Sequence, residues 1–457
     1  MVPTPRFYAL LILTGAIATG LAIFAPAAPL QIAGMPLQAM LVLDLVLVAL
    51  AVADGFRAKQ QRVSVARGPL ERLSVGRDNP VTLTVQPSAQ SSAKSGPKTI
   101  QIYDAYPAGM AGTAMPLQAA IASGEPQTLT YSVHPRRRGE VAWGKIHLRQ
   151  RGPWGLAWHQ WQVPQAQTVA VYPDLMGLRA LAVRLALQAS GSLQQRRRMS
   201  AGTEFSELRD YAAGDDPRLI DWKATARTGQ PLVKVMEPEQ EQTLIVLLDR
   251  GRLMTAQVEG LSRFDWGLNA TLSLALAGIR RGDRVGVGVF DSQVQTWLPP
   301  NRGQPHFSRL IERLTPIQPV LQESDYLSAV SMLVTQQHRR ALVVLITDIV
   351  DATASAELLS ALARLRPRYL PLCVALSDPY IQQRADQSNP ASNPSAQNAD
   401  IIQAAYARAA ALDLMDQRQV AFVKLRQKGV MVLDAPVDAV SEQLVDRYLQ
   451  IKARNQL

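Results

Sequence analysis

The sequence contains very little cysteine and histidine. Its single cysteine, Cys373, lies in the apolar run YLPLCVAL, where we expect it to pack in a strand, and one cysteine excludes a disulfide within the chain. The five histidines are dispersed, at positions 134, 147, 159, 306 and 338, with neither metal-ligand spacing nor a serine or cysteine placed for a triad. These residues therefore give no argument for an oxidising compartment, a zinc site or a hydrolase triad.

Complete phosphate-binding glycine motifs are also missing. The segment GEVAWGK has the glycine and lysine spacing of a phosphate-binding loop, but Ile146 replaces the hydroxyl that would contact magnesium, and EVAW is typical of a strand. GVGVF lacks the third glycine of a dinucleotide fingerprint. Asp249 closes an apolar run as a phosphotransferase nucleophile would, yet Gly251 stands where a second acid is needed. We therefore expect no enzymatic activity and no cofactor.

Negative charge is in deficit. The chain has 48 Lys and Arg against 37 Asp and Glu, a formal net charge of +11, which suits a membrane surface or nucleic acid. The runs HPRRRGE and LQQRRRMS lack the interleaved aromatic residues that stack on bases. We therefore interpret them as solvated or membrane-facing surfaces and do not expect a nucleic-acid partner.

Two long apolar runs begin the sequence. Residues 7–25 carry no charge over a length that can cross a hydrocarbon core of about 30 Å as a helix, and residues 36–53 follow after a short uncharged loop. Together they predict a transmembrane hairpin. The alternative is a secretory signal peptide, because Arg6 precedes the first run and APAA at 25–28 offers small residues for cleavage.

Charged residues in and after the second run bear on topology. Asp44 lies near its middle, where an ionised carboxylate costs roughly 2.5 to 3.5 kcal/mol on insertion scales. It is either a contact between helices or subunits, or a protonated acid that faces the hairpin partner. The loop between the runs has no base, whereas the second run is followed by Arg57, Lys59, Arg62 and Arg67. The positive-inside rule therefore places the rest of the chain in the cytoplasm.

The remaining chain shows two kinds of pattern. Residues 60–175 contain short alternating runs, such as VTLTVQ, TLTYSVH, VAWGKIHLRQ and TVAVYP, which predict an antiparallel β-sandwich. From residue 243 the runs TLIVLLD, RVGVGVF, ALVVLITD and YLPLCVAL are continuously apolar, as in strands buried on both faces of a parallel sheet. Helical segments alternate with them, so we expect a doubly wound α/β domain.

Local signals mark helices and loops of the second part. Ser262 and Asp265 have the spacing of a capping box, and Gly282 stands where a left-handed cap is needed, which predicts a helix between them. The segments at 88–98 and 386–399 are typical of flexible loops. Later helices are expected at about 306–316, 325–338, 353–366, 400–428 and 437–453.

The stretch GDDPRLIDWKATAR, residues 214–227, concentrates charge around a tryptophan. Asp216 as N-cap, Pro217 at the first helical position and Gly229 as terminator predict a helix over 217–228. Capping leaves much of the charge unexplained, and an aromatic ringed by charges is typical of a binding hot spot. We interpret as partner-binding the residues Arg209, Asp215, Arg218, Asp221, Trp222 and Arg227. The alternative is a structural clamp between the β-sandwich and the α/β domain.

The longer segment GTEFSELRDYAAGDDPRLIDWKATAR resembles the signature of the bacterial domain of unknown function fifty-eight. RRRGE, GPWGLAWHQ and DRYLQIKAR extend the resemblance over nearly the whole chain. It implies a membrane hairpin, a β-rich domain, this signature and a C-terminal domain similar to von Willebrand factor type A. It also implies a partner, an AAA+ ATPase of the MoxR type, with which such proteins are suspected to assemble or mature envelope proteins at the bacterial plasma membrane.

The resemblance bears on a metal site. Type A domains bind Mg²⁺ through Asp-x-Ser-x-Ser at the first strand, with a threonine and a further aspartate from later loops. Here the two hydroxyl ligands are lost from DRGRLM, and a guanidinium is added. The degenerate site consists of Asp249, Gly251, Arg252, Ser324 and Asp348. We expect no bound metal, and expect Arg252 to replace the ion by pairing with Asp249 or Asp348.

The sequence thus predicts a membrane-anchored α/β protein with two transmembrane helices, an antiparallel β-sandwich and a doubly wound parallel sheet. The expected domains are the hairpin at 1–58, the sandwich at 59–178, the signature segment at 179–242 and the α/β domain at 243–457. The expected function is that of a non-enzymatic interaction or scaffold protein with cytoplasmic domains. The alternative function is a metal-dependent adhesion module whose protein ligand completes the magnesium shell.

Overall fold

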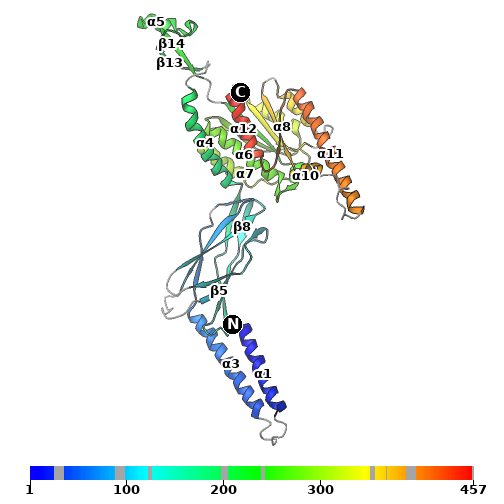
Figure 1. Cartoon of the computed structure of the whole chain (residues 1–457). Helices are drawn as coiled ribbons and strands as arrows, with labels where there is room; N and C mark the ends of the chain where they lie inside the picture. The colour runs from blue at the N-terminus through cyan, green and yellow to red at the C-terminus, as the bar shows by residue number, and fades with distance from the viewer. Residues whose placement is uncertain are drawn as a thin grey trace. The chain divides into compact units, whose positions relative to one another are not determined.

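The computed structural model describes residues 1–24, 35–70, 72–87, 98–121, 126–196, 204–237, 242–349, 356–366, 368–386 and 398–454 (Figure 1). The chain folds into two compact units, Met1–Tyr172 and Pro173–Leu457, each with its own sheets. The loops expected at 88–98 and 386–399 lie almost wholly outside the described residues, and the APAA segment at 25–28 lies outside them entirely.

Two apolar helices begin the first unit. α1 (Pro5–Phe24) and α3 (Met35–Gln60) pack side by side (Figure 1). Among the described residues, one helical segment, Gln38–Gln60, is long and apolar enough to cross a membrane. A second span stays a prediction. The Thr14 hydroxyl of α1 donates to Asp44 Oδ1 of α3 at 2.8 Å, so Asp44 faces its hairpin partner and makes a contact between the two helices. Protonation of Asp44 stays a prediction.

A buried carboxylate fixes the end of α3 to the β-rich part of the first unit. Asp54 is fully buried, and its two oxygens accept hydrogen bonds at 2.8, 2.8 and 3.1 Å from the backbone N–H groups of Trp154, Leu156 and Ala157. A carboxylate inside a protein is stable only when such donors replace its water. The last turns of α3 therefore belong to the β-rich fold, and Ala58 one turn later is buried too.

Three sheets form the rest of the first unit. Their strand orders are β1-β11-β10-β5-β7, β2-β4-β8-β6 and β3-β12-β9, and neighbours are antiparallel except β3 and β12. Burial alternates along β4 and β5, so each of these strands turns one face to the core. The predicted antiparallel strands are confirmed. Their bounds are β1 (Val2–Pro3), β2 (Ser64–Arg67), β3 (Leu73–Ser74), β4 (Asn79–Gln86), β5 (Lys98–Asp104), β6 (Met110–Gly112), β7 (Leu117–Ile121), β8 (Gln127–Pro135), β9 (Gly139–Trp143), β10 (Ile146–Arg151), β11 (Ala157–Val163) and β12 (Gln167–Tyr172).

One predicted run proves to be two strands. VAWGKIHLRQ divides into β9 and β10, which belong to different sheets. The division falls at Gly144, whose N–H donates to the carbonyl oxygen of Ala105 at 2.8 Å. A Cβ at Gly144 would lie 2.9 Å from that oxygen, so the close approach requires glycine.

Arg67, one of the bases that follow the second apolar run, has a structural partner in the β-rich part. Its side chain is buried, and its Nε donates to Asp104 Oδ2 at 3.0 Å. The Tyr131 hydroxyl donates to the same oxygen at 2.6 Å, and burial raises the pKa of Tyr131, which keeps the proton on this donor. Arg57 has a different environment, because its guanidinium carbon lies 4.4 Å from the ring centre of the half-exposed Trp154.

A six-stranded sheet is the centre of the second unit. Its order is β19-β18-β15-β20-β21-β22, and every neighbouring pair is parallel except β18 with β19. The four predicted apolar runs form β15, β18, β20 and β21, and Cys373 is fully buried in β21 as expected. The bounds are β15 (Thr243–Asp249), β18 (Arg284–Phe290), β19 (Val294–Asn301), β20 (Leu342–Thr347), β21 (Leu370–Ser377) and β22 (Met431–Pro436).

Helices pack in two groups around this sheet, as doubly wound folds require. α6 contacts α4, α7 and α12, whereas α9 contacts α8 and α11. Side chains of α8, α9 and α11 share one hydrophobic cluster with β15, β20 and β21. The bounds are α4 (Leu175–Arg196), α6 (Arg263–Arg280), α7 (Gln304–Leu314), α8 (Tyr326–Gln336), α9 (Ala356–Arg364), α10 (Pro379–Asp386), α11 (Asn398–Gln427) and α12 (Val440–Ala453).

The helices predicted from local sequence signals are present in this unit. Ser262 and Asp265 form the predicted capping box of α6, and Gly282 has a φ of +86° after its end. The five later helices all exist, with ends shifted by a few residues from those expected. α4 and α10 lie where the sequence predicts no helix.

We expect Asp54→Asn to destabilise the first unit by about 2–4 kcal/mol, because an amide can accept from fewer of the three backbone donors and turns its own N–H groups toward the rest. Thermal unfolding of the full chain in detergent micelles measures this change. Asp78→Asn is the matched control, since the Asp78 side chain is 77% exposed. Equal melting temperatures for the two variants would contradict the anchoring role of Asp54.

Candidate functional site

The signature segment forms a two-stranded hairpin with a helical insertion. β13 (Glu204–Asp210) pairs antiparallel with β14 (Leu232–Glu237), and a 3₁₀ turn, η1 (Pro217–Leu219), and the helix α5 (Trp222–Thr228) lie between them (Figure 1). Gly229 ends α5 with a φ of +74°, as the sequence predicts. We call residues 204–237 the signature hairpin.

The predicted single helix over 217–228 is wrong, because two caps divide it. Asp216 accepts from the backbone N–H of Arg218 and caps only the 3₁₀ turn. Ile220 is extended and bridges to Val233 of β14, so the helix cannot run through it. Asp221 then begins α5 by accepting from the N–H groups of its first turn. Asp221 is therefore a capping residue, although the sequence pattern assigned the cap to Asp216.

Two acids of the signature hairpin, Asp215 and Asp221, form ion pairs within it. Arg209 Nη2 donates to Asp215 Oδ1 at 2.5 Å, and this bond lowers the pKa of Asp215. Lys234 Nζ lies 3.2 Å from Asp221 Oδ2. The pKa of Asp221 is lowered first by the backbone N–H of Ala224 and then by Lys234. Of the predicted partner-binding residues, these acids and Arg209 therefore have internal partners.

The other predicted residues remain available at the surface. Trp222 is 69% exposed, which is unusual for so large an apolar side chain. Arg218 and Arg227 are exposed, and neither has an ion-pair partner among the described residues. Three more apolar side chains of the signature hairpin are at least one third exposed: Leu208, Tyr211 and Leu219. We call these six residues the hairpin surface.

A second candidate site lies at the carboxyl ends of the parallel strands. β15 has β18 on one side and β20 on the other, so the strand order reverses at β15, and such reversals are where α/β sheets bind ligands. Asp249 ends β15, and Asp348 follows β20 directly. Both carboxylates are buried, so each needs donors.

Asp249 obtains its donors from neutral groups. Oδ1 accepts from the Ser324 hydroxyl at 2.5 Å and the Gly251 N–H at 2.8 Å, and Oδ2 accepts from Thr347 Oγ1 at 2.6 Å. The Tyr326 hydroxyl adds a bond of 3.1 Å to Oδ2. Burial raises the pKa of Asp249, and these hydrogen bonds oppose the shift. Thr347 and Tyr326 were not predicted, because only the fold brings them to Asp249.

Gly251 explains why this site is closed. A Cβ there would overlap the Ser324 hydroxyl oxygen and lie 2.8 Å from the carbonyl oxygen of Gln322. The Ser324 hydroxyl thus fills the space that a side chain at position 251 would occupy, and it donates to Asp249. Among the described residues, no cluster of three or more acidic, histidine or cysteine side chains is suited to a metal ion.

The predicted role of Arg252 is wrong. Its Nε donates to Glu323 at 2.8 Å in an exposed ion pair, and its backbone N–H donates to the carbonyl of Gln322. Asp348 is instead held by Arg263 of α6 and Arg418 of α11, with a nitrogen of each 2.7 Å from one of its oxygens. These arginines are distant in sequence from Asp348, so no spacing signal points to them. The structure therefore brings together Asp249, Gly251 and Ser324 of the five predicted residues.

We expect Gly251→Ala to destabilise the second unit by about 1–3 kcal/mol, because the added methyl overlaps the Ser324 hydroxyl. In the Ser324→Ala background the same substitution should cost less, since the overlapping oxygen is gone. Thermal unfolding of the parent chain, the two single variants and the double variant gives the coupling free energy between positions 251 and 324. Gly109→Ala is the control, because nothing lies within 4 Å of its added Cβ. An equal loss of stability in both backgrounds would contradict the overlap between a side chain at position 251 and the Ser324 hydroxyl.

Relatives of this chain are known by sequence. The 180 residues shared with an uncharacterized protein of Mycobacterium tuberculosis are 26% identical and cover 39% of this chain and 56% of that one. A protein of Mycobacterium bovis matches equally well. The uncharacterized protein YeaD of Bacillus subtilis is 25% identical over 109 residues, which cover 24% of this chain and 25% of that one. The chain thus spans about half the length of the mycobacterial relatives.

Solved structures with some likeness include BatB of Bacteroides thetaiotaomicron, at 16% identity and a TM-score of 0.27, covering 46% of this chain and 99% of that one. An aerotolerance-related membrane protein of Bacteroides fragilis, with multiple mutations to serine, has 15% identity and a TM-score of 0.27, covering 47% of this chain and 97% of that one. The family model described as protein of unknown function DUF58 matches residues 207–387, which include most of the signature hairpin and β15 to β21.

Proposed function

We propose that this chain is a membrane-anchored, non-enzymatic interaction protein that docks a partner protein through the hairpin surface. The observation that carries the proposal is the 69% exposure of Trp222 on a segment in which ion pairs hold Asp215 and Asp221 in place. A tryptophan buries a large apolar area when a partner covers it, and it is among the residues most enriched at binding hot spots.

The internal ion pairs support docking because they make the signature hairpin rigid before a partner arrives. Asp215 ties the start of the insertion to β13 through Arg209, and Asp221 ties α5 to β14 through Lys234. A surface held in its bound shape loses less conformational entropy on association. Arg218 and Arg227 are exposed bases that suit acidic groups on a partner, whereas Glu207 and Asp210 of β13 are exposed acids that suit basic groups.

The clamp between the two units is the competing role for the same residues. A clamp would bury Trp222, so the clamp and docking hypotheses predict different effects of the same substitution. Loss of a buried tryptophan costs about 3–5 kcal/mol of stability, whereas substitutions of exposed side chains usually cost within about 0.5 kcal/mol.

The proposal also includes the identity of the partner and the side of the membrane on which the two units lie. The resemblance described above implies an AAA+ ATPase of the MoxR type, which acts in the cytoplasm, and envelope protein assembly or maturation as the process. Arg57, Lys59 and Arg62 at the end of α3 support a cytoplasmic position for the units that follow the membrane hairpin. The protein then holds the ATPase at the inner membrane.

We expect Trp222→Ala to weaken binding of the purified MoxR-type ATPase by roughly 30-fold, the effect of a hot spot of about 2 kcal/mol. The melting temperature should change by less than about 2 °C. Surface plasmon resonance and thermal unfolding of the full chain in detergent micelles measure the two effects. Tyr406→Ala is the matched control, because Tyr406 is an aromatic side chain with 75% exposure on α11.

Two results would count against docking. A fall in melting temperature of many degrees with unchanged ATPase affinity would assign the residue to a clamp. Unchanged affinity together with an unchanged melting temperature would leave Trp222 without either role.

A further inference from the structure

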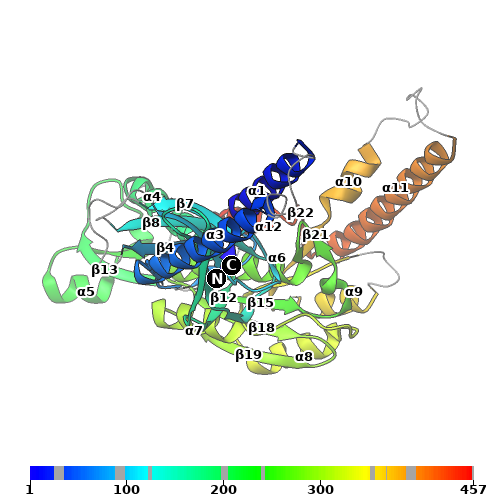
Figure 2. The same ribbon diagram turned by 90° about the horizontal axis from the view of Figure 1, so that it is seen from below.

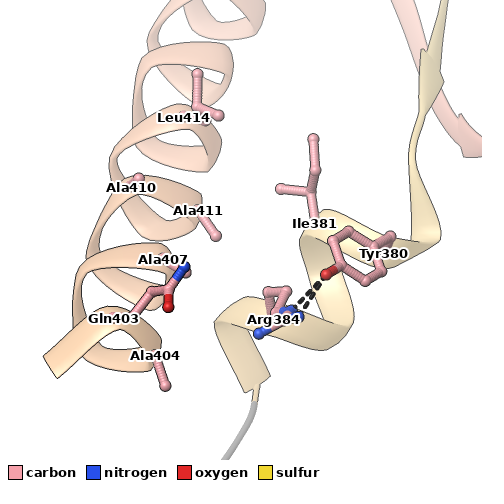
Figure 3. A pocket seen from close by; sticks show the side chains of 9 residues that line it. All are labelled: Tyr380, Ile381, Arg384, Gln403, Ala404, Ala407, Ala410, Ala411 and Leu414. Atoms are coloured by element: carbon pink, nitrogen blue, oxygen red, sulfur yellow. Dashed lines mark hydrogen bonds between the residues drawn. The ribbon is translucent and has the colours of Figure 1, made fainter. Parts of the chain in front are cut away.

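A second surface of the α/β unit lies between α10 and α11, away from the signature hairpin in sequence. The two helices run side by side (Figure 2), and a groove of about 490 Å³ opens between them (Figure 3). Its α11 wall is formed mainly by alanine side chains, including Ala404, Ala407 and Ala411. Tyr380, Ile381 and Arg384 of α10 form the opposite wall (Figure 3). The groove is therefore mainly apolar, and Arg384 adds one guanidinium to it.

The groove continues into a charged pocket. This pocket, of about 350 Å³, shares Ile381 and Leu414 with the groove, so one wall is common to both. The charged side chains that line it are three carboxylates and two guanidiniums: Asp348, Asp378, Asp434, Arg263 and Arg418. The pocket thus has one negative charge in excess.

Terminal nitrogens of both pocket arginines are paired with acids, whereas the buried Nε of Arg263 and of Arg418 has no hydrogen-bond partner among the described residues. Arg418 Nη1 donates to Asp348 at 2.7 Å and its Nη2 donates to Asp434 at 2.9 Å. Arg263 Nη1 lies 2.7 Å from Asp348. Burial lowers the pKa of Arg418, but Asp348 and Asp434 raise it above its ordinary value, so this guanidinium stays charged and paired. An anionic ligand would have to break these pairs.

The acids retain free capacity. The side chains of Asp378 and Asp434 are 20% and 29% exposed. The nearest arginine nitrogen lies 4.0 Å from Asp378 Oδ2, which is too long for a hydrogen bond. Asp434 Oδ2 has no partner among the described residues. A hydrogen-bond donor with positive charge fits this end of the groove.

We propose that the groove between α10 and α11 binds a segment of a partner protein in which an apolar side chain lies next to a lysine or arginine. The apolar side chain packs on the alanine wall of α11, and the cation enters the pocket and donates to Asp378 and Asp434. A divalent metal is disfavoured, because the carboxylates converge on guanidiniums that would repel it. The groove is distinct from the hairpin surface, so this proposal is independent of the proposed function.

Labelled tetrapeptides test the proposal by fluorescence anisotropy with the full chain in detergent micelles. The probes are acetyl-Leu-Leu-Arg-Leu-amide and the same peptide with norleucine or glutamate in place of arginine. We expect saturable binding of the arginine peptide, at least tenfold weaker binding of the norleucine peptide, and the weakest binding for the glutamate peptide. Added salt should weaken the arginine peptide most.

Three variants locate the binding. Asp378→Asn with Asp434→Asn should weaken the arginine peptide at least tenfold, whereas Asp413→Asn with Asp416→Asn, an equal loss of charge on α11 outside both pockets, should leave it within twofold. Ala407→Leu fills the groove without changing the charge of the chain and should weaken the arginine and norleucine peptides alike. This variant keeps the test valid even if loss of the Asp434 pair disturbs the fold.

Other outcomes overturn the proposal. Equal binding of all three peptides, preference for glutamate, or no saturable binding would do so. Concentration-dependent self-association of the chain that the double asparagine variant abolishes would assign the groove to a second copy instead. Trp222→Ala should leave peptide binding unchanged, so failure of the groove and failure of the hairpin surface are told apart.

Discussion

A buried carboxylate is stable only when hydrogen-bond donors surround it, and this requirement determines the chemistry at the carboxyl ends of β15 and β20. Asp249 meets it with neutral hydroxyl and N–H groups, and Gly251 leaves the room that the Ser324 hydroxyl needs. Asp348 meets it with Arg263 and Arg418, which come from helices of the two different groups around the sheet. Both solutions consume the hydrogen-bonding capacity of Asp249 and Asp348, so the proposed binding relies on other side chains.

The two proposed surfaces differ in their chemistry. In the signature hairpin, Asp215 and Asp221 are paired internally, and the large aromatic side chain of Trp222 stays exposed. In the pocket beside α11, the two arginines are neutralised and one acid is in excess. The proposed partners differ accordingly: the hairpin surface offers an aromatic anchor, and the pocket offers acids to a cation.

Sequence patterns predicted what depends on neighbouring residues and missed what depends on distant ones. The Ser262 cap of α6 and the continuous apolar runs of the parallel strands are local signals, and the structure confirms them. The division of VAWGKIHLRQ at Gly144 depends on the backbone of Ala105, and the partner of Arg67 is Asp104. At the strand ends, the spacing pointed to Arg252, but only the folded sheet brings Arg418 to an acid.

The most direct test of the central claim is photocrosslinking from position 222 in intact membranes, with a benzophenone side chain in place of tryptophan. If the hairpin surface docks a partner, the main product should contain a different protein, the AAA+ ATPase, and the yield should fall when unlabelled parent chain is added in excess. A main product that joins position 222 to residues 59–172 of the same chain would contradict docking and establish the clamp.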